Sequence, residues 1–338
     1  MKKLLAVLLS VLLACLCMAP AYASGEDPTR VHSDSFGAYD HVFIIGVDGA
    51  GRFFREVDTP NFDRIFAEGA VDYTARTETV TVSAQNWGSI LKGVSYLRHL
   101  HTNPSIANIE QDSSTLYPSI FTYARRAFPD AELSSYVHWG PINHGIIETD
   151  INVNKVSVGD DAELTDVICD YFNNGASPKL FFCHFDGVDE AGHEKGSNSA
   201  EYREQIMAVD GYIGRIYDTL EANGLMENGL FIVVSDHGHL RLGGHLGASA
   251  RESYTTVAVK GKTVVPGGAF DRNTRNRDVA AIALYALGID RPAHMSAVVP
   301  ANLFSDVAGE KHALYPDLID AITARFFLII TKLTALLH

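Results

Sequence analysis

The chain has 338 residues, 46% of them hydrophobic and 20% charged, which is typical of a globular protein with one large or two small α/β domains. Its formal net charge is −14 at pH 7, and it contains no long run of Lys or Arg. Nucleic acids and anionic membranes attract basic protein surfaces. We therefore expect neither a nucleic acid nor an anionic membrane as a partner. Cys169 and Cys183, the cysteines outside the N-terminal segment, are too few for a disulfide framework, and we expect buried thiols.

Residues 1–23 have the plan of a secretory signal peptide. Two lysines precede an apolar stretch from Leu4 to Leu16, and Ala21-Tyr22-Ala23 is a small-x-small cleavage site. We expect cleavage after Ala23. The run Leu12-Leu13-Ala14-Cys15 also resembles a bacterial lipoprotein box, in which case Cys15 would carry a lipid anchor. Both alternatives predict a secreted or envelope-associated protein.

The rest of the chain alternates predicted strands with predicted helices. In chain order we expect a strand at 41–47, a helix at 59–67, strand and loop at 70–82, helices at 83–93 and 117–128, a strand at 131–138, a helix at 162–173, a strand at 179–185, a helix at 202–223, strands at 230–234 and 253–259, and a helix at 278–287. This alternation predicts an α/β fold with a doubly wound, mainly parallel sheet and helices on both faces.

We expect one hydrolase domain over residues 24–310, followed by a C-terminal amphipathic helix within 311–338. The apolar stretch from Ile319 to Leu337 is interrupted by Arg325 and Lys332 and is short for a membrane span. Peripheral membrane contact through this helix is therefore an open alternative.

Three buried strands end in side chains that ligate metals. The first ends at Asp48, the strand at 179–185 leads to Asp189 and His193, and the strand at 230–234 ends in Asp236-His237 with His245 in the loop beyond. Ligands of open α/β sheets bind at the carboxyl ends of strands. Asp236 as a helix cap among ordinary loop histidines is the alternative, but it leaves the other clusters unexplained. Carboxylates with imidazoles suit zinc, with manganese or iron as alternatives.

A short predicted helix starts at or near Ser83 and ends before Gly93. Ser83 alone would be read as a helix cap. The amino end of a helix also favours a phosphate and an attacking oxygen, because its backbone N–H groups point outward. Ser83 is therefore a candidate nucleophile as well as a cap.

Together these motifs resemble the alkaline phosphatase superfamily, closest in pattern to its type I phosphodiesterase/nucleotide pyrophosphatase branch. Thr59-Pro60-Asn61-Phe62-Asp63 looks like that family's TPNxD helix start, and Ser83, Asn86 and Gly93 match its nucleophile segment. Asp189, His193 and Gly196 match its Asp-x-x-x-His-x-x-Gly motif, Ser235 to Gly238 match Ser-Asp-His-Gly, and His245 approximately matches its Gly-x-His-Gly loop.

The resemblance implies two divalent metal ions. It assigns Asp189, His193 and His245 to one ion, and Asp48, Asp236 and His237 to the other, with Ser83 touching the second. Two ions about 4 Å apart can stabilise the entering and leaving oxygens of a displacement at phosphorus. Asn86, one turn after Ser83, is placed to donate to a nonbridging phosphoryl oxygen.

The chain departs from each branch of the superfamily near the nucleophile. Serine replaces the usual threonine of the phosphodiesterase branch, and Gln85 stands where that branch often has proline. Val82 replaces the aspartate that precedes the serine of the monoesterase branch. Formylglycine sulfatases carry a C/S-x-P-x-R segment. The corresponding residues 83–87 of this chain contain neither Pro nor Arg, so we do not expect a formylglycine sulfatase.

The sequence therefore predicts a metal-dependent hydrolase of small-molecule or headgroup phosphate esters that acts through phospho-Ser83. Residues 77–91 contain no basic side chain and offer Asn86 and the aromatic face of Trp87 instead. One neutral donor and an apolar wall favour a singly charged diester, with Lys92, His99 or His101 as alternative sources of charge. Competing hypotheses are a phospho-headgroup transferase of the same fold, a sulfatase-like hydrolase and a non-catalytic metal-binding relative.

Overall fold

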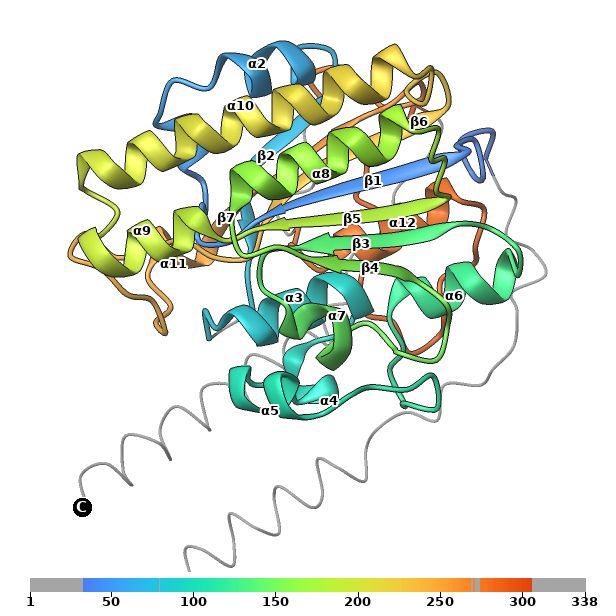
Figure 1. The fold of residues 1–338 in the computed structure, drawn as a ribbon, viewed down its shortest axis with the longest axis horizontal. Helices are drawn as coiled ribbons and strands as arrows, with labels where there is room; N and C mark the ends of the chain where they lie inside the picture. Colours follow the sequence, from blue (N-terminus) through green and yellow to red (C-terminus); the bar gives the residue numbers. More distant parts are fainter. Residues whose placement is uncertain (1–32, 79, 269, 271–273, 306–338) are drawn as a thin grey trace, which may run out of the picture.

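The computed structural model describes residues 33–305, apart from residues 79, 269 and 271–273. Its strands form one seven-stranded sheet with the order β2-β7-β6-β1-β5-β3-β4. The strands are β1 (His41–Val47), β2 (Ala70–Arg76), β3 (Leu133–Val137), β4 (Asn154–Ser157), β5 (Leu180–Phe185), β6 (Gly229–Ser235) and β7 (Tyr254–Lys260). Figure 1 shows the sheet between two layers of helices.

The centre of the sheet is parallel. Strand β1 pairs in parallel with β5 on one side and with β6 on the other, and β3 pairs in parallel with β5 and β4. Strand β7 is antiparallel to both β6 and β2. The parallel register brings the last residues of β1, β5 and β6 together at one edge, where Val47 pairs with Phe185 and Ser235.

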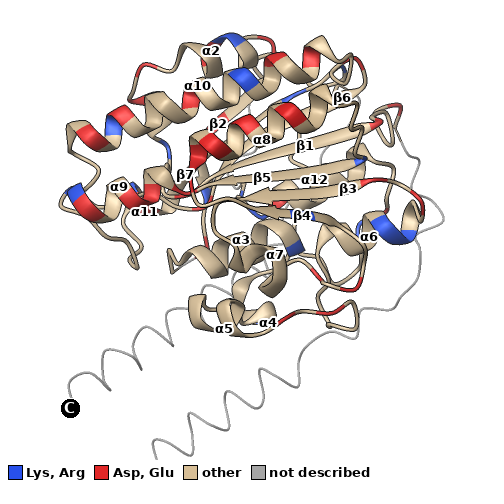
Figure 2. Cartoon of the chain, in the orientation of Figure 1, with Lys and Arg blue, Asp and Glu red and all other residues tan. Residues whose placement is uncertain are grey.

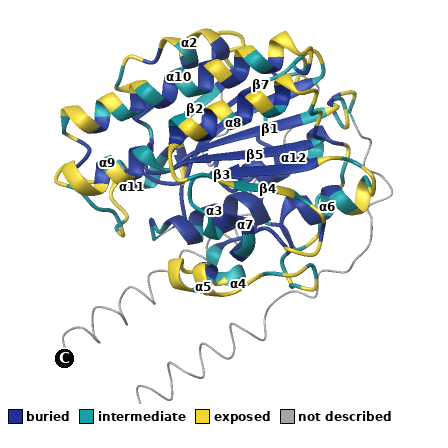
Figure 3. Cartoon of the chain, in the orientation of Figure 1, coloured by how far each residue is buried: buried dark blue, intermediate teal, exposed yellow. Residues whose placement is uncertain are grey.

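Strand β1 shows why this sheet needs helices on both faces. Val42 and Ile44 belong to one hydrophobic core cluster, whereas Phe43, Ile45 and Val47 belong to the other. A continuous apolar strand buries alternate side chains on opposite faces, so each face must be covered. Figure 3 shows the central strands β1 and β5 buried in the middle of the molecule.

One face is covered by short helices that include the nucleophile segment. Their bounds are α3 (Ser83–Lys92), α4 (Tyr96–His99), α5 (Asn103–Asn108), α6 (Ile120–Ala127), α7 (Pro141–Gly145) and α12 (Asp278–Ala286). Helix α3 packs Trp87 and Leu91 into this core, and it ends where Gly93 adopts the left-handed conformation at φ 65°. Glycine adopts this conformation without steric cost, so Gly93 fixes the end of α3.

The other face is covered by the 3₁₀ turn η1 (Phe53–Arg55) and by α2 (Pro60–Phe66), α8 (Asp161–Asn173), α9 (Gly187–Lys195) and α10 (Ala200–Ala222). The short α11 (Ala250–Ser253) lies near α9 at the carboxyl edge of the sheet (Figure 1). Figure 2 shows acidic residues along the outer surfaces of α8 and α9. In the 23-residue α10, Ile206, Val209 and Ile213 are buried against this face.

The structure confirms the predicted fold class and the predicted order of major elements. The helix predicted from residue 117 begins at Ile120, and the segment carrying Asp189 and His193 forms the helix α9. Cys169 and Cys183 are buried free thiols, as expected. The sequence patterns did not indicate β4, α4, α5, α7 or α11, which are each four to six residues long.

The expected signal peptide (1–23), the alternative anchor at Cys15 and the C-terminal helix (311–338) lie outside the described residues, and the proposed domain bounds 24–310 stay a prediction. Within residues 33–305, none of the described helices combines the length and hydropathy that a membrane span requires.

Candidate metal centre

Asp48 follows β1 directly and is buried, with 1% of its surface exposed. Its Oδ2 accepts a hydrogen bond from Nε1 of Trp87 at 2.7 Å and lies 3.1 Å from Nε2 of His184 in β5. Its Oδ1 is buried and makes no hydrogen bond to the residues that the structure describes. One oxygen of Asp48 is therefore held by the core, and the other is left for a ligand.

Asp236 and His237 follow β6, the strand beside β1, and both are fully buried. The Oδ1 atom of Asp236 accepts hydrogen bonds from the backbone N–H of Gly49 at 3.0 Å and of His237 at 2.7 Å. The Nε2 atom of His237 lies 3.2 Å from Oδ2 of Asp236 and 3.5 Å from Oδ1 of Asp48. Donor atoms of Asp48, Asp236 and His237 lie within 4.8 Å of one another, as the sequence predicted.

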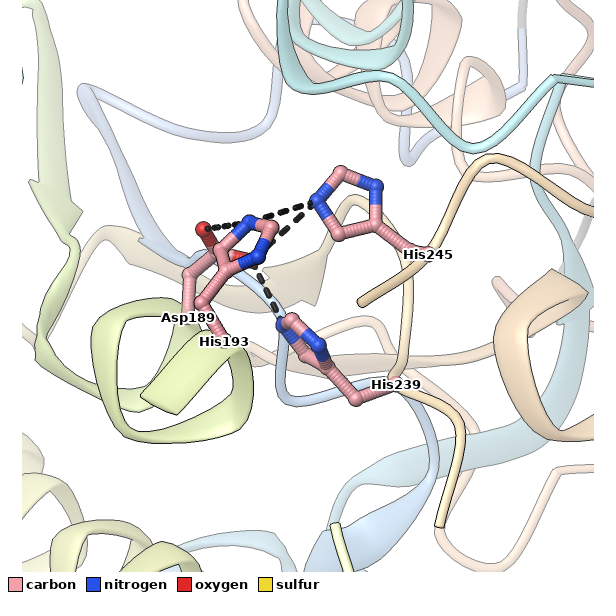
Figure 4. Close-up of side chains that lie close together, drawn as sticks. All are labelled: Asp189, His193, His239 and His245. Carbon is pink, nitrogen blue, oxygen red and sulfur yellow. Dashed lines mark hydrogen bonds and ion pairs between the residues drawn. The ribbon is translucent and has the colours of Figure 1, made fainter. Parts of the chain in front are cut away.

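The second predicted set also comes together, with one more histidine. Figure 4 shows Asp189 and His193 from α9 facing His239 and His245 from the loop after β6. The Nε2 atom of His193 is 3.3 Å from Oδ2 of Asp189 and 3.0 Å from Nε2 of His245. All four residues offer donor atoms within 4.8 Å of one another. Asp189 and His193 are four positions apart, which places both on one face of α9.

A glycine allows α9 to approach β1 closely. Gly49 has φ 69°, and a Cβ atom there would lie 2.7 Å from the Cα atom of Asp189. Any other residue would separate Asp189 from Asp48 or strain the backbone. The two sets also meet at His237, whose Nε2 lies 3.9 Å from Oδ1 of Asp189. They therefore form one binuclear arrangement.

Burial shifts the pKa values of two groups in the cluster in opposite directions. Burial, together with the charges of Asp48 and Asp189, raises the pKa of Asp236 well above its usual value. Burial lowers the pKa of His237 to about 3, so this imidazole is neutral at physiological pH, the form that binds metals. Among the described side chains, Oδ1 of Asp48 and Oδ2 of Asp236 are buried acceptors without a hydrogen bond. Carboxylates clustered with imidazoles are donors that fit two divalent cations.

Ser83 lies beside the set formed by Asp48, Asp236 and His237. It is the first residue of α3, is 6% exposed, and places its Oγ 3.2 Å from Nε2 of His237. Val82 is the N-cap residue, and the first turn of α3 has no side-chain cap. The reading of Ser83 as a helix cap is therefore wrong. Its hydroxyl faces the carboxylate and imidazole cluster instead.

Asn86 lies one turn after Ser83 in α3, and its side-chain amide is engaged by the protein itself. Its Nδ2 donates to the carbonyl oxygens of Val80 and Val82, and its Oδ1 accepts from the backbone N–H of Glu78 and from Nδ2 of Asn276. Both amide donors are thus engaged by the loop before Ser83. Asn86 shapes that loop, and its contact with a substrate oxygen stays a prediction that would require these bonds to be exchanged.

The loop that carries His245 is tied to the segment before Ser83. Nδ1 of His245 donates to the carbonyl oxygen of Thr81, and the backbone N–H of Leu246 donates to Oγ1 of Thr81 at 2.9 Å. Glu252 holds the same loop through the backbone N–H of Gly247. Because Nδ1 of His245 carries the proton of this hydrogen bond, its Nε2 has a free lone pair. That lone pair is directed at Asp189 and His193, which is the orientation of a metal ligand.

Comparison with known proteins agrees with this geometry. The model of the type I phosphodiesterase/nucleotide pyrophosphatase family matches residues 118–317, more than half of the chain. The chain belongs to this family. It therefore also belongs to the alkaline phosphatase superfamily, as the motifs indicated.

Solved structures with this fold include family members and more distant proteins. Murine ectonucleotide pyrophosphatase/phosphodiesterase 5 is 14% identical, with a TM-score of 0.58 over 75% of this chain and 96% of that chain. A protein solved with its substrate D-glucosamine-2-N,6-O-disulfate is 13% identical, with a TM-score of 0.56 over 77% of this chain and 78% of that chain. At such identities the likeness shows the shared fold.

Curated relatives include fungal transferases. GPI ethanolamine phosphate transferase 2 of Aspergillus fumigatus is 23% identical over 223 residues, which cover 63% of this chain and 29% of that protein. GPI ethanolamine phosphate transferase 1 of Candida glabrata is 25% identical over 149 residues, covering 39% of this chain and 16% of that protein. The chain thus spans less than a third of the length of either relative.

The sequence patterns assigned no role at the centre to His184 or His239, and they placed Trp87 as an aromatic wall for the substrate. That place for Trp87 is wrong, because its side chain is fully buried and its Nε1 donates to Asp48. His184 lies inside β5, and Trp87 inside α3, so each resembles an ordinary core residue until the packing is known. His239 carried a weak signal, because it stands two residues after His237 in the same loop.

Proposed function

We propose that this protein hydrolyses phosphate esters with two bound divalent metal ions, most simply zinc, and with Ser83 as the nucleophile. The observation that carries the proposal is the position of Ser83 Oγ, which is 3.2 Å from Nε2 of His237 at the edge of a buried binuclear donor set. Bound cations would neutralise the phosphate oxygens and lower the pKa of the Ser83 hydroxyl. Manganese or iron would suit the same donors.

The proposed reaction has two displacements at phosphorus. In the first, Ser83 Oγ loses its proton and bonds to phosphorus while the bond to the leaving alcohol oxygen breaks, and that oxygen takes up a proton. In the second, water attacks phosphorus, the bond to Ser83 Oγ breaks, and the serine hydroxyl is restored. Asp48, Asp189 and Asp236 would hold the two metal ions in place through both steps.

The surroundings of Ser83 favour a diester. Lys92 is directed away from Ser83: its Nζ contacts Glu148 and the carbonyl oxygen of Tyr117. Burial lowers the pKa of His101 to about 3 and that of His99 well below its usual range, so both rings are neutral. Lys92, His99 and His101 therefore offer no positive charge at Ser83. This supports a diester, because a singly charged diester needs less charge compensation than a dianionic monoester.

The test compares a matched aryl phosphate monoester, a methyl aryl phosphodiester and an aryl sulfate, with purified protein of measured metal content. We expect the highest kcat/KM on the diester. A strong preference for the monoester would refute the diester assignment and leave the hydrolase assignment intact. Loaded protein that cleaves none of the three esters would refute the hydrolase assignment.

A second candidate function is transfer of a phospho-headgroup to an acceptor other than water. The fungal relatives carry the name of such transferases, and Leu242 and Leu246, on either side of His245, are 97% and 66% exposed. An apolar rim suits a lipid-linked substrate. If transfer is the function, an added lipid or glycan alcohol will divert the phospho group from water and accumulate as a phosphorylated product.

The protein's place of action follows from the N-terminal pattern. We propose a secreted or envelope-associated protein, because residues 1–23 read as a signal peptide with Cys15 as an alternative lipid anchor. N-terminal sequencing of the mature protein distinguishes cleavage after Ala23 from cleavage before Cys15.

A further inference from the structure

Asn276, two residues before α12, joins the two parts of the site that carry Ser83 and Asp236. Its side chain is fully buried. Its Nδ2 donates to Oδ1 of Asn86 at 3.2 Å and to the backbone carbonyl oxygen of Asp236 at 3.1 Å. The sequence patterns assigned no role to Asn276. A single side chain thus connects the nucleophile helix α3 to the residue that follows β6.

On the side of Ser83, Asn86 extends this connection to the start of α3. Nδ2 of Asn86 donates to the carbonyl oxygen of Val82 at 3.1 Å, and Val82 directly precedes Ser83. Oδ1 of Asn86 also accepts from the backbone N–H of Glu78 at 2.9 Å. The orientation of the Asn86 amide is therefore fixed, because its donors face carbonyl oxygens and its acceptor faces N–H groups. A shift of this amide would shift the backbone that carries Ser83.

On the metal side, Asn276 holds the backbone of Asp236 and leaves its carboxylate to other groups. Oδ1 of that carboxylate accepts from the backbone N–H of Gly49 and of His237. His237 in turn places its Nε2 3.2 Å from Oγ of Ser83. Loss of the Asn276 side chain would therefore leave the carboxylate of Asp236 held, but would remove the hydrogen bonds between α3 and this strand end.

The next residue, Arg277, holds the same loop at a second point. Its Nη1 lies 3.0 Å from Oε1 of Glu78, and both side chains are almost fully buried. Glu78 also donates its backbone N–H to Asn86. Asn276 and Arg277 thus contact the segment that leads to Ser83 through two neighbouring partners.

Packing alone does not explain an asparagine at position 276. Its Oδ1 is buried and makes no hydrogen bond to the residues that the structure describes. A buried acceptor without a partner is destabilising, and a leucine of similar size would avoid that cost. What the asparagine contributes is its Nδ2, which donates to both Asn86 and Asp236.

We propose that Asn276 is a positioning residue that holds the first turn of α3, and with it Ser83, at a fixed distance from Asp236. This inference rests on the proposed function, in which Ser83 Oγ attacks phosphorus. Asn276 acts through Asn86 and is not itself a metal ligand. Because a displacement of about 1 Å in a reacting group can cost about 10²-fold in rate, loss of this side chain should lower kcat. It should leave KM and metal affinity almost unchanged.

The test uses the full-length, metal-loaded protein with an aryl phosphodiester. Asn276→Leu removes the donor at similar volume, and Asn276→Ala is a second variant that introduces no new packing. Asn143→Leu is the matched control. Asn143 is also buried, its Nδ2 donates to the carbonyl oxygen of Val156, and its Oδ1 has no partner among the described residues. Circular dichroism confirms that each variant is folded.

The measured quantities are kcat, KM, bound metal, and the inhibition constants of orthovanadate and inorganic phosphate. Orthovanadate mimics the pentacoordinate phosphorus of the transition state when it bonds to the nucleophile oxygen, whereas phosphate binds without that bond. Weaker inhibition by orthovanadate alone therefore reports a displaced Ser83 Oγ.

We expect both Asn276 variants to lower kcat by about 10–100-fold, with KM and bound metal within about 3-fold of wild type. Inhibition by orthovanadate should weaken by a similar factor and inhibition by phosphate should not, while Asn143→Leu should change neither. An unchanged kcat in the Asn276 variants, a loss of metal in step with kcat, or an equal loss in Asn143→Leu overturns the inference. Wild-type protein that holds both ions and cleaves no phosphate ester refutes the proposed function itself.

Discussion

The indole N–H of Trp87 donates to Oδ2 of Asp48 at 2.7 Å, linking the nucleophile helix to the end of the central strand. Trp87 lies over Gly46 of β1, where an added Cβ atom would be 2.5 Å from the indole. Its ring also meets His184 edge-on at 4.9 Å. One buried side chain thus fixes the orientation of Asp48 and the distance between α3 and the sheet.

Trp87→Phe should weaken binding of the second metal ion by about 10–100-fold, because it removes the hydrogen bond that orients Asp48 but keeps an aromatic ring. Gly46→Ala should have the same effect by displacing the indole. Calorimetric titration of Zn²⁺ into the metal-free variants checks both. Equal affinity in Trp87→Phe and wild type would show that His184 alone suffices to orient Asp48.

Removing the metal ions should abolish turnover reversibly. The donor set places three carboxylates close together, and their charge must be compensated for an anionic substrate to bind. We expect two ions per chain by elemental analysis, loss of activity on chelation and recovery on adding Zn²⁺. Asp236→Ala should lose both metal and activity. Protein that is fully active without any transition metal would contradict the two-metal assignment.

The neutral His101 predicts acid sensitivity. Burial, with the nearby charge of Lys92, lowers its pKa to about 3, compared with about 6.5 in the unfolded chain. Between these values the unfolded state binds more protons, so stability is complete above pH 6.5 and falls as the pH drops. Relative to His101→Gln, the wild type should lose about 1.4 kcal/mol of unfolding free energy per pH unit between about pH 6 and 4. Parallel pH profiles in denaturant titrations would contradict this.

The buried pair of Lys92 and Glu148 predicts a stability effect that leaves the metals in place. Their charged atoms are 3.3 Å apart, and Glu148 also accepts from Ser119 and Thr122. Lys92→Met should cost about 3–5 kcal/mol of unfolding free energy, because it leaves a buried carboxylate without its cation. The double variant Lys92→Met/Glu148→Gln should recover part of this loss. Denaturant unfolding measures both, and a more severe loss in the double variant would refute the explanation.

Much of the fold could be predicted because the central strands are long apolar runs with clear ends. The predicted strand at 41–47 coincides with β1, and the strand at 230–234 lies within β6, because both faces of each strand are buried. The short helices α4, α5 and α7 span four to six residues and lack a periodic apolar face of sufficient length. Helices α4 and α5 pack against α3, and α7 packs against α5, so their positions depend on tertiary contacts.

The site could be predicted where a strand end supplies a charged residue, as at Asp48 and Asp236. The parts of the site that depend on contacts between residues far apart in the sequence could not be predicted. Trp87 reaches Asp48 across 39 positions in the sequence, and His239 reaches Asp189 across 50. The role assigned to Asn86 shows the same limit, since its hydrogen bonds to the loop before Ser83 depend on the path of that loop.

The most direct test of the account is the turnover of Ser83→Ala on an aryl phosphodiester, with the metal content of the same sample measured by elemental analysis. The variant removes the proposed attacking oxygen beside His237 but leaves the six predicted carboxylate and imidazole ligands in place. The account predicts two bound ions and a loss of at least about 10³-fold in kcat. Near-wild-type turnover by Ser83→Ala with both ions bound would contradict it, because the nucleophile would then be a water-derived oxygen instead of Ser83.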